Sequence, residues 1–388
     1  MSERRYDAVV VGGGAVGAAT AAALAQAGVL TALIEKGEAP ASFDPRNYDL
    51  RVYALSPGSV RFLRALGIWE RILTARACAY ESMRVWEDEA VHALHFDAAE
   101  AGVPHLGYIV ENKLLLSALW SRLEAVSIFE KAQIARWQYD DGGAHLRLRD
   151  GRELETRLVI AADGADSVLR GEAGIDCATW PYPQQAIVCH VQTERPHHHS
   201  AYQRFLPTGP LAFLPLADGR CSIVWSSSEA WRLLTLEDRE FMDALTQAGQ
   251  RVLGAVSACT PRVAYPLRLL HAEKYVRERF ALVGDAAHVI HPLAGQGVNL
   301  GIADAQALAE VLGEAKADGR DLGHLRVLQR YERARRADNL DMLALTEGLY
   351  RIFSPGAEPL KPLRRSGMEA VQRLRPLKDF FVRRAMQA

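Results

Sequence analysis

The sequence predicts an α/β fold in which a Rossmann-like nucleotide-binding domain carries an inserted domain built on an antiparallel β-sheet. A glycine-rich turn separates a short apolar run at 6–11 from an alanine-rich stretch at 15–27, the order of a strand and a tightly packed helix. Between 176 and 275, short alternating runs separated by Pro and Gly are typical of antiparallel strands. A buried-strand pattern returns at 279–283, so the first domain resumes after the inserted sheet.

Length and composition limit the class of protein. At 388 residues the chain is longer than one hydrophobic core usually serves, so two domains are expected. The formal net charge of −1 indicates no basic surface for nucleic acid, and we expect no nucleic-acid partner. The cysteines are scattered, odd in number and never in a CxxC pair. This usage predicts a cytoplasmic protein without a disulfide framework or a zinc ribbon.

The uncharged stretch from Ala8 to Ile34 has two interpretations. Its length and lack of charge are compatible with a signal peptide or a membrane span. However, it is rich in glycine and alanine, which are only weakly apolar, and a strand, a helix and a second strand at 30–34 explain the same residues. We therefore predict a βαβ unit here.

The turn of this βαβ unit matches the dinucleotide-binding fingerprint GxGxxG over residues 12–17. The first glycine permits the tight turn, the second lets a pyrophosphate approach the backbone, and the third lets helix and strand pack closely. The helix N-terminus offers free N–H groups to phosphates, and Glu35 at the end of the next strand is placed to bind ribose hydroxyls. The fingerprint predicts a bound ADP moiety but does not distinguish NAD from FAD. The residues expected to bind it are Gly12, Gly14, Ala15, Val16, Gly17, Glu35 and Lys36.

The remaining elements follow from periodicity and turn residues. Helical patterns cover 57–66, 111–125, 298–314 and 323–350. The pairs Asp141-Gly142 and Asp150-Gly151 each separate alternating runs, which predicts hairpins and strands at 144–148 and 153–160. The strands expected in the inserted sheet are 186–192, 202–206, 211–216 and 221–226.

Residues 279–301 carry a second motif, with Gly284-Asp285 followed by a loop from Pro292 to Gly297. This segment resembles the class A flavoprotein monooxygenases. The resemblance implies that Asp285 binds the ribityl chain of FAD and that the loop borders the isoalloxazine ring, with Val298 and Asn299 opening the next helix. A third match, Asp163 to Arg170, is similar to the Asp-Gly motif of the same family, which implies a place for Asp163 near the pyrophosphate. Ala161 replaces the usual glycine of that motif.

Further segments of the sequence resemble the hydroxylases of ubiquinone biosynthesis. They lie at 49–56, which would supply an FAD-contacting Arg51, at 107–112 and at 202–211. Asn112 stands where many relatives carry Arg or Gln facing the cofactor, so its role is less defined. The resemblance covers the chain except about its last thirty residues.

The resemblance implies a mechanism and a substrate class. A donor, NAD(P)H bound transiently because no second GxGxxG exists, reduces FAD. O2 then adds at the flavin C4a, and the hydroperoxide transfers a hydroxyl group to the ring of a hydrophobic polyprenylated phenol or quinol. No side chain is identified as a catalytic base; a dry pocket around the flavin is expected instead, with the loop residues Pro292, Gly295, Gln296 and Gly297. Two alternatives remain: a hydroxylase of a small soluble aromatic, and a non-catalytic flavoprotein in a biosynthetic assembly.

The expected organisation has three parts. The FAD-binding domain comprises 1–75, 105–175 and 276–350, the substrate domain comprises 76–104 and 176–275, and 351–388 is a basic helical tail. Within 361–388, eight Lys or Arg are interleaved with apolar residues at near-helical spacing. Such a segment either contacts a membrane surface or an acidic partner in a ubiquinone-biosynthesis complex, or packs on the body, and the sequence favours neither. A membrane contact would make the chain peripheral at the inner face of the membrane.

Two histidine clusters raise the question of a metal site. His288 and His291 have the i, i+3 spacing of ligands, but no third and fourth ligand is recognisable nearby. We expect these residues to position the loop beside the flavin, and the run 197–199 to be a solvated loop. No metal is therefore predicted.

Overall fold

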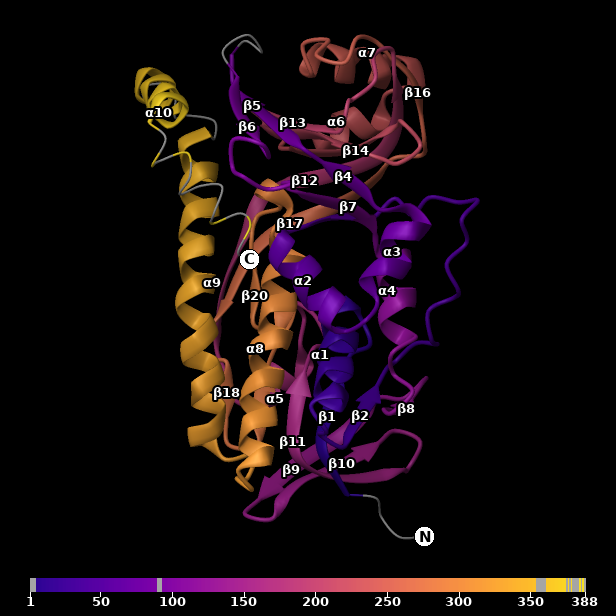
Figure 1. Ribbon diagram of the computed structural model, residues 1–388, viewed down its shortest axis with the longest axis vertical. Helices are drawn as coiled ribbons and strands as arrows, with labels where there is room; N and C mark the ends of the chain where they lie inside the picture. Colours follow the sequence, from indigo (N-terminus) through magenta and orange to yellow (C-terminus); the bar gives the residue numbers. More distant parts are fainter. Residues whose placement is uncertain are drawn as a thin grey trace.

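The computed structural model describes residues 5–88, 93–353 and 361–374, together with Pro376, Lys378, Arg384 and Met386. The molecule is elongated, with one sheet in its lower half and another across its top (Figure 1). The predicted domains and tail therefore include residues outside the described ones, namely 1–4, 89–92, 354–360 and most of the end of the tail.

The lower half is built on a largely parallel sheet. Its strands, in spatial order, are β18 (Val276–Arg277), β19 (Phe280–Leu282), β11 (Glu153–Ala161), β1 (Arg5–Val11), β2 (Thr31–Ile34) and β8 (Ser127–Phe129). All neighbouring pairs from β19 to β8 are parallel, and β18 is antiparallel. An antiparallel hairpin of β9 (Ile134–Asp140) and β10 (Gly143–Leu148) extends β11. The βαβ unit and both predicted hairpins are confirmed.

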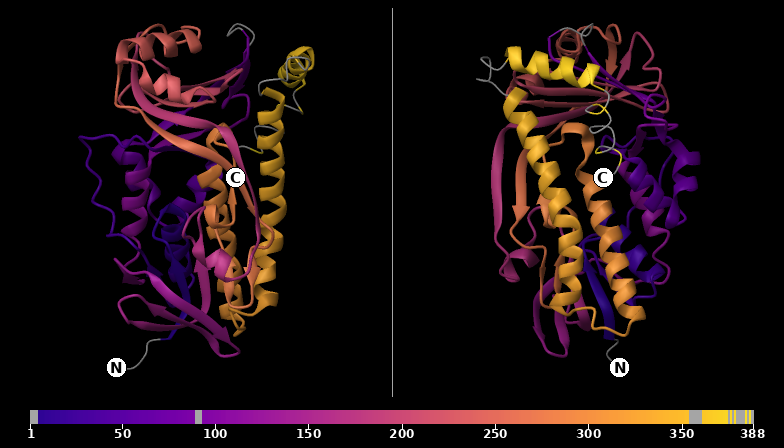
Figure 2. Two further views of the ribbon diagram at one scale, coloured as in Figure 1. Left: turned by 180° about the vertical axis from the view of Figure 1, so that it is seen from behind. Right: turned by 60° about the vertical axis from the view of Figure 1, so that its left-hand side comes forward.

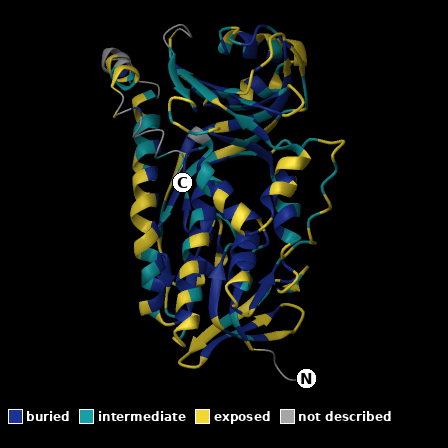
Figure 3. Ribbon diagram, viewed as in Figure 1, coloured by how far each residue is buried: buried dark blue, intermediate teal, exposed yellow. Residues whose placement is uncertain are grey.

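Helices cover this sheet. They are α1 (Ala15–Gln26), α2 (Pro57–Ala65), α3 (Trp69–Arg76), α4 (Asn112–Trp120), α5 (Val168–Glu172), α8 (Gly297–Ala317) and α9 (Leu325–Phe353). Because α1 consists mainly of alanine and is buried, neighbouring elements approach it closely. Figure 2 shows α8 and α9 side by side along one flank, and Figure 3 shows that the outer surface of α9 is exposed while α1 and the sheet are buried.

The upper half contains an antiparallel sheet. Its strands, in spatial order, are β20 (His288–Val289), β17 (Val263–Ala272), β12 (Cys177–Thr193), β15 (Cys221–Ser227), β14 (Gly209–Pro215), β13 (Ser200–Leu206), β5 (Ser82–Trp86) and β6 (Leu94–Asp97), with β16 (Val256–Cys259) also paired to β12. One face carries large apolar residues that pack with α6 (Ala230–Thr235) and α7 (Asp238–Ala248). The long strands β12 and β17 continue down into the lower half (Figure 2).

A small antiparallel sheet lies between the two halves. It orders β3 (Val52–Leu55), β7 (Gly107–Glu111) and β4 (Cys78–Tyr80). The buried Glu111 carboxylate accepts from Arg76 at 2.7 Å and from the backbone N–H of Asp49 at 2.7 Å. These contacts fix the segment before β3, which carries Arg51.

The predicted α/β class, with a Rossmann-like sheet and an antiparallel sheet, is confirmed. Some boundaries differ: the helix predicted over 111–125 ends at Trp120, and β12 begins at Cys177 rather than at 186. The elements that were not predicted include the strands β5, β6 and β17 and the helices α6 and α7. In the 76–104 segment, β4 joins the small sheet whereas β5 and β6 join the upper sheet, and the exact domain limits stay a prediction.

In the predicted tail 351–388, residues 351–353 continue α9, and α10 (Lys361–Arg373) lies near β6 and the end of α9 (Figure 1). Three basic side chains of the tail have acidic partners on the body. Arg364 pairs with Glu87 at 2.5 Å, Lys378 with Glu100 at 2.5 Å and Arg384 with Asp341 at 3.0 Å. For these three residues the packed interpretation is favoured. The side chains of Lys361, Arg365, Leu377, Phe380, Phe381, Arg375 and Arg383 lie outside the described part.

Across the described ranges, no helix combines the length and the apolar character needed to cross a lipid bilayer.

Candidate active site

A cavity of about 570 Å³ connects the glycine turn after β1 with the lower face of the upper sheet. It brings together eleven of the predicted site residues: Gly14, Ala15, Val16, Gly17, Arg51, Asn112, Asp285, Pro292, Gly295, Gly297 and Val298. Six others do not line it: Gly12, Glu35, Lys36, Asp163, Gln296 and Asn299. One continuous cavity thus reaches from the nucleotide fingerprint to the substrate-domain sheet.

The glycines of the turn have different physical roles. Gly12 has a φ of +107°, and a Cβ there would lie 2.3 Å from the Ala162 carbonyl oxygen. A Cβ at Gly17 would lie 1.9 Å from the Gly12 oxygen, so strand and helix could not pack as closely. A Cβ at Gly14 would meet no protein atom within 4 Å, and Gly14 lines the cavity. Two glycines are therefore required by the fold, and Gly14 leaves room for a ligand against the backbone.

Glu35 supports the turn in the structure. Its carboxylate accepts from the backbone N–H of Gly13 at 2.5 Å and from that of Gly37 at 2.8 Å. The Trp120 indole N–H donates to the Gly13 carbonyl at 2.9 Å. Lys36 is exposed and away from the cavity. Binding of ribose by Glu35 and Lys36 stays a prediction.

Two carboxylates have oxygen atoms that accept no hydrogen bond from any described residue. The Oδ1 atom of Asp163 is buried and has no hydrogen-bond partner among those residues. Asp285 is exposed to the cavity, has no such partner, and is otherwise surrounded by protein. Loss of hydration raises the pKa of Asp285, although His288, Arg51 and Arg268 oppose the shift. The buried Oδ1 of Asp163 is a costly unsatisfied acceptor, and the Asp285 carboxylate faces the cavity without a donor among the described residues, so both fit a ligand that carries hydroxyl donors.

The loop from Pro292 to Gly297 borders the middle of the cavity. Gly295 has a φ of +63°, and its Cβ position would lie 3.1 Å from the Ala54 Cβ. A Cβ at Gly297 would meet nothing within 4 Å. The helix α8 starts at Gly297 without a side-chain cap, so its first N–H groups and its positive dipole end lie at the cavity wall. This wall favours a ligand that acquires negative charge next to it.

Asn299 and Gln296 act within the protein. The Asn299 side chain accepts from the backbone N–H of Ser56 at 3.0 Å and from the Ser59 hydroxyl at 2.8 Å, and donates to the Ala54 carbonyl at 2.9 Å. It also donates to Gln296 at 3.3 Å. These contacts join the start of α8 to β3 and α2. Any contact of Asn299 with a cofactor would therefore come from its backbone.

Arg51 and Asn112 are joined at the cavity by Tyr53, which sequence reasoning missed. The Arg51 guanidinium carbon lies 5.3 Å from the Tyr53 ring centre, and the Tyr53 hydroxyl donates to Asn112 Oδ1 at 3.0 Å. Burial raises the pKa of Tyr53, so its hydroxyl stays protonated. Tyr53 lies within the segment 49–56 that the sequence had already marked, which was the available signal.

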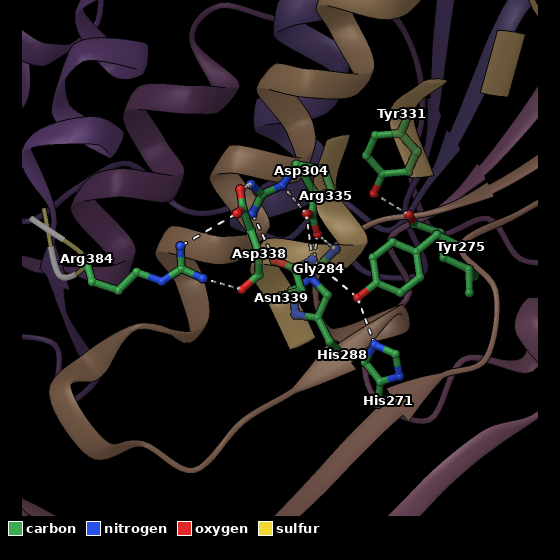
Figure 4. Close-up of polar contacts among 11 residues, drawn as sticks. His271, Tyr275, Gly284, His288, Asp304, Tyr331, Arg335, Asp338, Asn339 and Arg384 are labelled. Atoms are coloured by element: carbon green, nitrogen blue, oxygen red, sulfur yellow. Dashed lines mark hydrogen bonds and ion pairs between the residues drawn. The ribbon is translucent and has the colours of Figure 1, made fainter. Parts of the chain in front are cut away.

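A buried ionic network holds the Gly284-Asp285 turn (Figure 4). Asp304 on α8 is fully buried and accepts from the Gly284 N–H at 3.1 Å and from His288 Nε2 at 2.6 Å. Its other oxygen accepts from Arg335 at 2.9 Å and from Asn339 at 3.2 Å, both on α9. Burial alone would raise the pKa of Asp304, but His288 and Arg335 outweigh it and lower the pKa. Sequence reasoning missed this network; the signal was a charged residue on the apolar side of each helix.

His291 positions the loop from the other side. Its Nδ1 accepts from the Leu293 backbone N–H at 3.3 Å, and its Nε2 bonds Gln184 Oε1 at 3.1 Å. Gln184 in turn donates to the Thr208 carbonyl in the β13–β14 turn at 2.9 Å. Burial lowers the pKa of His291 to about 4, so the ring is neutral near pH 7. Within the described ranges, no group of three or more His, Cys, Asp or Glu is arranged to hold a metal ion.

Comparisons with known proteins agree with this geometry. A family model described as an FAD binding domain matches residues 5–344. The chain is 40% identical over 384 residues to the 3-demethoxyubiquinol 3-hydroxylase of Escherichia coli (strain K12), covering 97% of each protein. It is 41% identical over 390 residues to ubiquinone hydroxylase UbiL of Rhodospirillum rubrum, covering 99% of this chain and 90% of that protein.

Solved structures show the same fold. The structure of P. aeruginosa PqsL in complex with 2-aminobenzoylacetate matches with a TM-score of 0.80 at 23% identity, covering 94% of this chain and all of that one. FAD is the cofactor, and the open space at Gly14 together with the unsatisfied carboxylate of Asp163 fits it. The chain belongs to the ubiquinone-biosynthesis hydroxylase family of class A flavoprotein monooxygenases, and it is an FAD-dependent aromatic-ring hydroxylase.

Proposed function

We propose that this protein hydroxylates the aromatic ring of a polyprenylated phenol or quinol in ubiquinone biosynthesis. The observation that carries the proposal is the similarity to ubiquinone hydroxylases over nearly the whole chain, at 40% identity. The cavity supports it, because the space beside the glycine turn continues under a sheet face lined mainly by small apolar residues. A flat, apolar ring fits that space next to the loop Pro292–Gly297.

When bound, FAD supplies the activation of O2, with NAD(P)H as the donor typical of the family. The residues of the chain would hold and orient it. We propose that Asp285 accepts hydrogen bonds from ribityl hydroxyls, that Asp163 accepts one near the pyrophosphate, and that Arg51 places positive charge beside the ring system. The N-terminus of α8 would stabilise negative charge on the pyrimidine side of the ring.

Exclusion of water is the second task of the site. The loop Pro292–Gly297 is fixed from two sides, by Asn299 toward β3 and by His291 toward the upper sheet. Among the residues that face the ring space, the sheet contributes Ala186, Val188 and Ala212. Such walls keep a reactive oxygen species away from bulk water.

The prenyl chain of such a substrate would come from a membrane, so we include contact of segment 361–388 with a membrane surface in the proposal. Arg364, Lys378 and Arg384 have acidic partners on the body. The contact would therefore depend on the other basic residues of the tail. A ubiquinone-biosynthesis complex is the alternative partner for the same surface.

The test is lipid mass spectrometry of cells that lack the gene. We expect accumulation of a ubiquinone precursor that lacks one ring oxygen, with rescue by the wild type. Asp285→Ala should not rescue and should lose FAD while staying folded. The matched control is Glu310→Ala, an exposed acid on α8, which should rescue fully.

Two results would contradict the proposal. A normal ubiquinone profile in the deletion, with flavin bound to the purified protein, would favour a small soluble aromatic as the substrate. An Asp285→Ala protein that is yellow at wild-type flavin occupancy would remove the role of that residue.

A further inference from the structure

The lower face of the upper sheet forms the roof of the cavity and is built from small side chains. Gln203 on β13 pairs with Ala212, Ala212 pairs with Val224, and Val224 pairs with Val188. Directly paired residues point to the same side of a sheet, so these four form one row across four strands. All four line the cavity. The row leaves space for a flat ring because three of its members are Ala or Val.

Gln203 is the exception in this row. It is 7% exposed and lines the cavity, yet among the described residues neither its amide nitrogen nor its amide oxygen has a hydrogen-bond partner. Neither amide atom is sealed inside the protein, so both reach the space of the cavity. The carboxamide is therefore available to a ligand that enters the cavity.

Gln184 provides the contrast within the same sheet. It is buried to a similar degree, at 5% exposed, but its oxygen bonds His291 and its nitrogen bonds Thr208. The oxygen and the nitrogen of the Gln184 amide are therefore both used in contacts within the protein. Gln203 has no such use among the described residues, and unlike Gln184 it lines the cavity.

The chemistry of an amide limits what Gln203 can recognise. A carboxamide presents an N–H donor and a carbonyl acceptor side by side. A ring with a hydroxyl group next to an ether or a second hydroxyl group presents the complementary pair, an O–H donor beside an oxygen acceptor. Two parallel hydrogen bonds would orient the ring in its plane, and orientation decides which ring carbon meets the flavin.

We propose that the Gln203 carboxamide is a specificity-determining contact that binds two adjacent ring oxygens of the substrate. This inference rests on the proposed function, because it takes an oxygenated aromatic ring as the ligand. The inference adds which substituents the ring carries, namely two adjacent oxygens, and which residue recognises them.

The test compares Gln203→Met with the wild type. Methionine has nearly the same length and volume but offers no amide, so folding and FAD content should be unchanged. Gln192→Met is the matched control, because Gln192 is an exposed residue of β12 in the same sheet and does not line the cavity. Binding of 2-methoxyphenol and of methoxybenzene, which lacks the hydroxyl group, is measured from the change in flavin absorbance.

We expect the wild type and Gln192→Met to bind 2-methoxyphenol at least about 10-fold more tightly than methoxybenzene, since a site built to bond a hydroxyl rejects the analogue that lacks it. Gln203→Met should bind the two probes equally. Discrimination that survives in Gln203→Met, or its absence in the wild type, would overturn the inference.

The same variant separates this inference from the proposed function. If the deletion strain makes normal ubiquinone, the proposed function fails, while the binding experiment still reports on Gln203. If the wild type rescues ubiquinone and Gln203→Met rescues it at the same rate, the proposed function stands and the inference fails.

Discussion

Replacing Asp304 with asparagine tests the buried network that holds the Gly284-Asp285 turn. The substitution keeps the shape of the side chain but removes the charge between His288 and Arg335, whose side chain is only 10% exposed. Removing one partner of a buried ion pair costs about 3–5 kcal/mol. Arg335 keeps a second contact with Asp338 at 3.2 Å, which places the expected loss near the lower end, about 3 kcal/mol.

The assay is urea-induced unfolding together with FAD titration. Because Asp304 accepts from both Gly284 and His288, we expect Asp304→Asn to weaken FAD binding at least about tenfold in addition to lowering the free energy of unfolding. The control is Asp338→Asn, which changes a 52% exposed partner of the same arginine and should cost less than about 1 kcal/mol. Equal losses in the two variants, or an Asp304→Asn protein as stable as the wild type, would refute the reasoning.

Three further outcomes are expected. Gly14→Ala should weaken FAD binding and leave the apoprotein stable, whereas Gly17→Ala should destabilise the apoprotein by about 1–3 kcal/mol, as unfolding of both apoproteins would show. The pKa of His291 lies below its usual value of 6.5, at about 4, so the unfolded chain binds the extra proton and stability falls as the pH drops from 6.5 toward 4. The contribution of His291 alone to this loss at pH 5 should be about 2 kcal/mol, and equal urea midpoints at pH 7 and pH 5 would contradict it. Deleting 361–388 should reduce sedimentation with anionic liposomes at low salt, and unchanged sedimentation would leave the tail a packed segment.

The local sequence predicted those parts of the molecule in which the backbone conformation determines which residue is needed. At Gly12 and Gly17 the need for glycine follows from the turn, and the expected turn was found after the expected strand. Hairpins at Asp141-Gly142 and Asp150-Gly151 followed for the same reason. The class of the upper sheet also followed, because alternation along one strand needs no knowledge of its neighbours.

Side-chain partners from distant segments could not be predicted in the same way. Asp304 meets Arg335 only because α8 and α9 pack side by side, and Arg384 meets Asp341 only after the tail returns to α9. Asn299 lies at the expected helix start, but its side chain bonds β3 and α2, which the local sequence does not specify. In the sequence, nothing distinguishes Gln203 from other strand residues. Its place in the cavity roof follows only from the pairing of β13 with β14.

The most direct test of the central claim is the source of the oxygen atom added to the ring. Purified protein is supplied with lipid extract from the deletion strain, with NADH and NADPH in parallel, under ¹⁸O2. We expect one ¹⁸O atom in the ring of the product, and no product with Asp285→Ala. A ring oxygen that derives from water, or flavin reduction without any ring hydroxylation, would contradict the account.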